Sequence, residues 1–105
     1  MIMVREVMNC KPGKVGEMVK RFKAVNEAMG EMGLEPFRIF TDVVGEQFWT
    51  LVLQREYETL GEYHELESKV MADERFKSAM SGYHEAVTTG RREIFLRSFP
   101  ELTRK

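Results

Sequence analysis

The chain has 105 residues, which predicts one domain with a modest hydrophobic core. Its sixteen Lys and Arg residues are dispersed among seventeen Asp and Glu, and the formal net charge is −1. This balance argues against a role that depends on long-range attraction to nucleic acid or to an anionic membrane. The single cysteine, Cys10, excludes a disulfide within the chain.

The N-terminal stretch is apolar, but Arg5 and Glu6 interrupt it, so it has neither a signal-peptide core nor the length of a membrane span. We therefore expect a cytoplasmic protein. The expected domain covers residues 1–100, and the expected polar tail covers residues 101–105.

Residues 2–10 alternate between two sets of side chains, which is typical of a strand. Pro12 and Gly13 then provide a turn. Apolar side chains recur at steps of three and four residues over the next stretch, which predicts an amphipathic helix ending near Gly30 and Gly33. The apolar stripe comprises Val15, Met18, Val19, Phe22, Val25, Met29 and Met32.

Two further strands are predicted over 36–44 and 48–57, with GEQ (45–47) as a short hairpin connection. Phe37 and Ile39 share one face, and Phe40 lies on the other. In the third strand, Phe48 and Val52 alternate with Trp49, Leu51 and Leu53, and the pattern leaves open which set faces the helices.

Residues 58–87 are predicted to form two helices separated at 72–74, where Asp73 is the N-cap of the second. Gly90 is expected to end that second helix. A last strand is predicted over 91–99, with Ile94 and Leu96 on one face and Phe95 and Phe99 on the other.

The predicted order is βαββαβ, which favours an α+β ferredoxin-like fold: a four-stranded antiparallel sheet with helices on one face. Each strand carries large apolar groups on both faces, so one apolar face would remain uncovered in a monomer. We therefore expect a homodimer in which the uncovered sheet faces of two copies meet.

With this order of elements, the chain resembles the dimeric α/β-barrel superfamily. Within it the chain is similar to NIPSNAP-like domains and, more distantly, to antibiotic-biosynthesis monooxygenase domains, in the stretches DVVGEQFWTLVLQREYETLGEYHEL and DERFKSAMSGYHEAV. The resemblance implies a dimeric α/β barrel with a ligand cavity between sheet and helices.

The haem-degrading branch of this superfamily uses an Asn, a Trp and a haem-ligating His that follows an FKxA sequence. In this chain Met80 stands where that His would follow FKSA, and Trp49 lies on a predicted strand rather than in the helical region. The resemblance therefore does not extend to haem degradation, and we expect no cofactor.

The tripeptide Tyr-His-Glu occurs twice, at 63–65 and 83–85, and includes both histidines of the chain. Measured against the apolar stripes of the two predicted helices, Tyr63 and Tyr83 point inward, whereas His64 and His84 lie at the border. Each histidine is therefore either solvated or an acid–base group at the rim of a cavity. These four residues are the catalytic candidates.

A metal site requires three or four convergent ligands, and His64 with Glu67 offers two, so no metal is expected. Trp49, Arg38, Tyr63 and Tyr83 are the candidates for binding a small hydrophobic or aromatic ligand, with core or interface packing as the alternative for the aromatic residues. Arg38 or Arg5 is suited to hold an anionic or phenolate oxygen.

Three functions remain open on the sequence alone. The first is ligand binding without catalysis. The second is a cofactor-independent monooxygenase that acts on a phenolic or polycyclic substrate. The third is an isomerase or decyclase that uses His or Tyr as its acid–base group.

Overall fold

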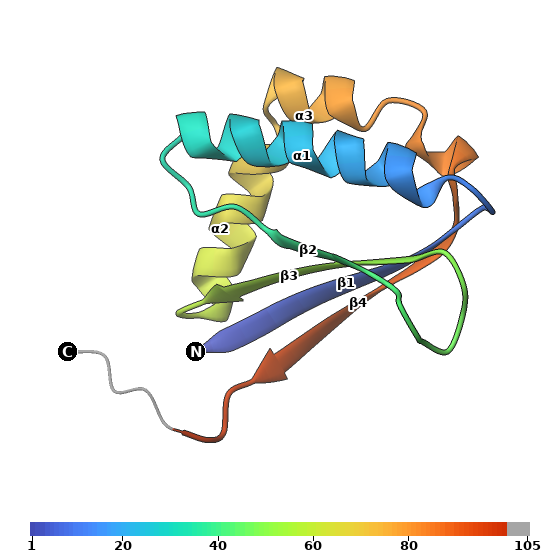
Figure 1. The fold of residues 1–105 in the computed structure, drawn as a ribbon. Coiled ribbons are helices and arrows are strands. Elements are labelled where there is room, and N and C mark those ends of the chain that lie inside the picture. The colour runs from blue at the N-terminus through green and yellow to red at the C-terminus, as the bar shows by residue number, and fades with distance from the viewer. Residues whose placement is uncertain (101–105) are drawn as a thin grey trace.

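The computed structural model describes residues 1–100 of the chain. Four strands and three helices, with one short 3₁₀-helix, follow one another along these residues (Figure 1). In chain order they are β1 (Ile2–Cys10), α1 (Val15–Glu31), β2 (Arg38–Thr41), β3 (Thr50–Tyr57), α2 (Leu60–Met71), α3 (Glu74–Ala79), the 3₁₀-helix η1 (Tyr83–Glu85) and β4 (Val87–Leu96).

The strands form one antiparallel sheet in the order β2-β3-β1-β4. All helices lie on one side of it: α1 and α3 run side by side over the sheet, and α2 descends to the end where β1 begins (Figure 1). This arrangement confirms the predicted α+β ferredoxin-like fold.

The main core lies between α1 and the middle of the sheet. Met18, Phe22 and Val25 on α1 are buried against Leu51 and Leu53 on β3. These α1 residues come from the stripe that the sequence predicted, since positions three and four apart share one helix face.

The predicted break in the second helical region is confirmed. Thr59 caps α2 by accepting a hydrogen bond from the Glu62 N–H, and the Asp73 carboxylate caps α3 by accepting one from the Arg75 N–H at 2.8 Å. Each cap satisfies an N–H group that has no partner within its own helix.

The prediction that the second of these helices continues to Gly90 was wrong. Helix α3 ends at Ala79, and Gly82 then adopts a left-handed φ of 73° that a helix cannot accommodate. Residues from Val87 onward pair with β1, and Gly90 lies opposite Met8 inside β4. The second Tyr-His-Glu therefore forms η1 and is not a copy of the helical first one.

The predicted hairpin was also too tight. Strand β2 ends at Thr41 and β3 begins at Thr50, so residues 42–49 form the loop in place of the three-residue connection. The Asp42 carboxylate accepts a hydrogen bond from the Thr50 N–H at 2.7 Å, and Val43 and Val44 are almost fully exposed.

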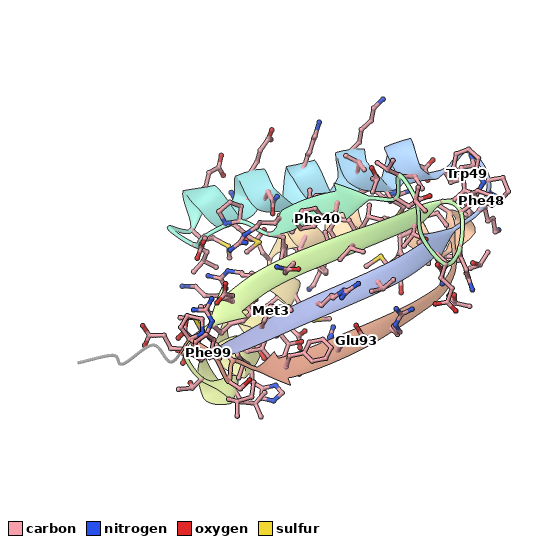
Figure 2. The ribbon with its side chains drawn as sticks, turned by 60° about the horizontal axis from the view of Figure 1, so that its bottom comes forward. Met3, Phe40, Phe48, Trp49, Glu93 and Phe99 are labelled. Atoms are coloured by element: carbon pink, nitrogen blue, oxygen red, sulfur yellow. The ribbon has the colours of Figure 1, made fainter. Side chains whose placement is uncertain are left out.

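The structure decides which side chains face the helices. Leu51 and Leu53 point inward and are fully buried, whereas Val52 faces the uncovered side of the sheet. Figure 2 views this open face, with Met3, Phe40 and Glu93 on its strands.

The predicted tail at 101–105 lies outside the described residues. Within residues 1–100, none of the helices combines the length and the apolar character that crossing a bilayer would require.

Candidate functional site

A cavity of about 310 Å³ lies between the sheet and the helices. Its volume falls in the range of small-molecule sites, and most of its wall is apolar. The apolar and aromatic lining residues are Val4, Met8, Phe22, Met29, Phe37, Leu53, Tyr57, Tyr63, Leu66, Val70, Met71, Phe76, Met80 and Tyr83.

A connected polar group spans three elements at this cavity. The Tyr63 hydroxyl on α2 donates to Glu67 Oε2 at 2.6 Å, and Arg92 Nη1 on β4 lies 2.9 Å from the same oxygen. Arg92 also donates from Nε to Glu6 Oε1 on β1 at 2.9 Å. Arg92 therefore pairs with both carboxylates that line the cavity.

Burial and the hydrogen bond to Glu67 hold the pKa of Tyr63 well above its ordinary value. Burial also raises the pKa of Tyr57, although the adjacent Arg55 guanidinium acts to lower it. The two rings meet edge to face with centroids 5.1 Å apart. Both phenols are therefore neutral near pH 7, and Tyr63 acts as a hydrogen-bond donor to Glu67.

Arg55 is the least expected residue of the cavity wall. It lies on β3 between Leu53 and Tyr57, on the inward face, and it is only 7% exposed. Its guanidinium carbon stands 4.4 Å from the centre of the Tyr57 ring. Within residues 1–100, neither Nε nor Nη1 has a hydrogen-bond partner.

The candidates predicted from the sequence occupy different places. Tyr63 and Tyr83 both line the cavity, but Tyr63 is buried whereas Tyr83 is 43% exposed. His64 and His84 are exposed and contribute nothing to the cavity lining.

Trp49 and Arg38 also lie away from the cavity wall. Trp49 ends the β2–β3 loop in a left-handed backbone conformation, φ 60°, beside Phe48 and Val15. Arg38 lies on the open face of the sheet, with Nη2 3.7 Å from Glu56 Oε1.

The sequence reasoning did not identify Arg55, Arg92, Glu6 or Glu67 as site residues, although Glu6 stood out between inward-facing apolar positions. The available signal was the alternation itself, since a strand whose Leu51 and Leu53 face inward must also direct Arg55 inward. Arg92 and Glu67 have no comparable signal, because their meeting depends on how α2 packs over β4.

A metal centre is not apparent among residues 1–100, where no three His, Cys, Asp or Glu side chains are placed to hold an ion. Of the charged groups that line the cavity, Glu6 and Glu67 instead form ion pairs with Arg92, and Arg55 takes no part in these pairs.

Comparison with known proteins supports the fold. No family model and no curated protein matches this sequence. Among solved structures, a NIPSNAP family protein from Agrobacterium tumefaciens is similar with a TM-score of 0.79 and 17% identity, over 98% of each chain.

Two other solved structures extend the likeness. An uncharacterised NIPSNAP-like domain protein from Burkholderia xenovorans has a TM-score of 0.80 at 14% identity, over 97% of this chain and 89% of that one. An antibiotic biosynthesis monooxygenase has a TM-score of 0.68 at 14% identity, over 93% of this chain and 99% of that one.

The chain is thus a ferredoxin-like α+β domain. More particularly, its fold is that of NIPSNAP-family and antibiotic biosynthesis monooxygenase-like proteins, as the resemblance in sequence implied. At these identities the likeness concerns the fold.

Proposed function

We propose that this protein binds a small hydrophobic or aromatic molecule in the cavity between sheet and helices. The observation that carries this proposal is an apolar cavity of about 310 Å³ that has few polar groups, all at defined positions. Phe76 on α3 and Leu66 on α2 give the ligand an apolar wall. Arg55 and the Tyr63–Glu67–Arg92 group supply orientation.

Filling the cavity tests the proposal. Leu66→Trp inserts a bulky ring at a lining position and should weaken binding of a neutral aromatic probe such as 1-naphthamide by at least about tenfold, because ligand and indole compete for one space. Leu60→Trp is the matched control, since Leu60 lies on the same helix, is 48% exposed and is not a lining residue.

The result is read by isothermal titration calorimetry on folded variants. Equal affinity in wild type, Leu66→Trp and Leu60→Trp would place the binding elsewhere and remove the cavity from the function. Native mass spectrometry of the protein purified from its own host would then identify the class of any co-purifying ligand.

A cofactor-independent monooxygenase is the second candidate. The supporting observation is a mostly apolar cavity lined by a buried cation, Arg55, whose charge would stabilise a phenolate oxygen. In such a reaction an anthrone CH₂ becomes a carbonyl: one oxygen atom of O₂ enters the carbon, and the other leaves as water with both hydrogens. No external reductant is required.

Oxygen consumption with anthrones and hydroquinones tests this second candidate. His64→Ala and His84→Ala should leave any rate unchanged, because both histidines are exposed and neither lines the cavity. A large loss in either variant would show that a histidine takes part after all. Absence of oxygen uptake with the whole panel would leave binding as the function.

We also propose a homodimer formed through the open sheet face. Phe40 and Phe95 on that face are 47% and 46% exposed. Met3 lies on the same face, opposite Phe95 in the register of β1 and β4 (Figure 2). Apolar side chains gathered on an uncovered sheet favour contact with a second copy. Light scattering at micromolar concentration should give twice 12.3 kDa, and Phe40→Arg should reduce it to the monomer mass.

A cytoplasmic location is proposed as well, supported by the free and buried thiol of Cys10. Fractionation of the native host tests this location directly.

A further inference from the structure

We propose that the cavity ligand carries one anionic oxygen group, a carboxylate or a phenolate, and that this group binds the buried guanidinium of Arg55. The inference rests on the proposed ligand-binding function and adds the charge class of the ligand to it. Its basis is that Nε and Nη1 of the buried Arg55 side chain have no hydrogen-bond partner among the described residues.

Arg55 is buried at a high cost in solvation. Its side chain is held on the inward face of β3, 93% removed from solvent, as its 7% exposure shows. An arginine remains charged at any pH at which the protein is folded, so it cannot escape this cost by losing a proton. Buried charges in proteins are therefore normally paired or fully hydrogen-bonded.

The described residues satisfy Arg55 only in part, through Tyr57 beside its guanidinium. Nε and Nη1 carry three N–H donors between them, and neither atom has a hydrogen-bond partner in residues 1–100. The Tyr57 ring lies 4.4 Å from the guanidinium carbon and attracts the charge, but a ring face is a weaker acceptor for N–H groups than an oxygen atom.

The nearby carboxylates are already engaged. Glu6 and Glu67, which line the same cavity, both bind Arg92, at 2.8 and 2.9 Å. Glu67 also accepts the hydrogen bond from Tyr63. Both carboxylates are therefore held by Arg92, and neither accepts a hydrogen bond from Nε or Nη1 of Arg55. An anionic oxygen group on the ligand is the acceptor best suited to these unused N–H donors.

The shape of the cavity defines the rest of the ligand. Val4, which lies opposite Arg55 on β1, and Leu53 and Val70 belong to the apolar wall, and the volume of about 310 Å³ suits a body of one or two fused rings. The fitting class is therefore an aromatic or compact aliphatic acid, or a phenol that binds as its phenolate. A neutral ligand of the same shape would offer Arg55 only an uncharged acceptor, which forms a weaker hydrogen bond.

The first test compares wild-type affinities by calorimetry for three probes of one shape: 1-naphthoate, 1-naphthamide and 1-naphthol. The inference expects naphthoate to bind at least about tenfold more tightly than naphthamide, the factor associated with one charge-assisted hydrogen bond. If the phenolate is the preferred group, naphthol affinity should instead rise steeply as the pH approaches the naphthol pKa.

The second test uses Arg55→Met, which retains an unbranched apolar stem but removes the charge. The ligand-free variant should be at least as stable to heat as wild type, because it loses a desolvated charge whose Nε and Nη1 have no hydrogen-bond partner among residues 1–100. It should also bind naphthoate no better than naphthamide. Arg91→Met is the matched control: Arg91 is an arginine of β4 that lies away from the cavity and is 52% exposed at its side chain.

The outcomes are distinguishable. If wild type binds naphthamide as tightly as naphthoate and naphthol at every pH, the proposed binding function stands and the anionic class is wrong. Failure of all three probes to bind counts against the binding function itself. An unchanged preference for naphthoate in Arg55→Met would overturn the role of Arg55, and a marked loss of heat stability would show that Arg55 has a structural partner instead.

Discussion

The hydrogen bond from Tyr63 to Glu67 offers the sharpest test of the cavity's internal structure, through the substitution Tyr63→Phe. The change removes one hydroxyl that donates at 2.6 Å and leaves the ring to pack as before. A hydrogen bond to a charged group contributes about 1.5–3 kcal/mol to stability. Because Glu67 keeps its contact with Arg92, we expect a loss of about 1.5 kcal/mol, near the lower end of that range.

The measurement is equilibrium unfolding in urea at pH 7, where the loss should appear as a lower midpoint at unchanged slope. In a thermal scan the same loss corresponds to a fall in Tm on the order of 5–10 °C. Tyr83→Phe is the matched control, since it occupies the second Tyr-His-Glu, is 43% exposed and should change little. Equal stabilities of the two variants would refute the reasoning.

Because of Tyr63, we also expect the stability of the folded protein to depend on pH in the alkaline range. The pKa of Tyr63 is raised in the folded state, so above about pH 10 the folded protein retains a proton that the unfolded chain releases. The stability that this proton provides is complete below about pH 10 and falls by about 1.4 kcal/mol per pH unit above it. Tyr57 contributes in the same direction, so Tyr63→Phe should reduce this slope without abolishing it.

Three further predictions concern other elements. Asn26→Ala removes the side chain that bonds both the N–H and the C=O of Phe37 and should cost about 1–3 kcal/mol in urea unfolding, whereas exposed Glu27→Ala should cost less than about 0.5. Hydrogen bonds from the side chain and backbone of Arg75 lower the pKa of Asp73 to about 2, so the stability that this carboxylate provides should be lost as the pH falls from about 4 to about 2, and Asp73→Asn should flatten that part of a pH–stability profile. The Cys10 thiol, buried and with its pKa raised by that burial, should react with iodoacetamide only in denaturant; rapid alkylation of the folded protein would contradict its burial.

Local sequence patterns predicted the structure correctly where no distant part of the chain competed for the same residues. The stripe from Met18 to Met29 predicted the buried face of α1, and the break at Asp73 followed from the residues that favour a cap. These features depend on neighbours within about one turn of helix, so the sequence contains what is needed to predict them.

The apolar pattern of residues 76–87 predicted a helix that is longer than the observed one, because strand pairing with a distant part of the chain is more favourable there. Residues from Val87 to Gly90 pair with β1, whose other edge is already occupied by β3, and this pairing satisfies backbone groups along both strands. Gly82 makes the reversal possible by taking up a left-handed φ. Spacing alone does not reveal a partner that lies about eighty residues away.

The candidate site likewise combines features that the sequence predicts with features that depend on tertiary packing. The sequence by itself determined the order of elements, the ferredoxin-like fold and the inward direction of Tyr63, because periodicity and caps act locally. Only the tertiary structure placed Arg92 between Glu6 and Glu67 and left Nε and Nη1 of Arg55 without a hydrogen-bond partner among residues 1–100. Pairing of charges depends on which elements meet in space, and that meeting is decided by the packing of helices on the sheet.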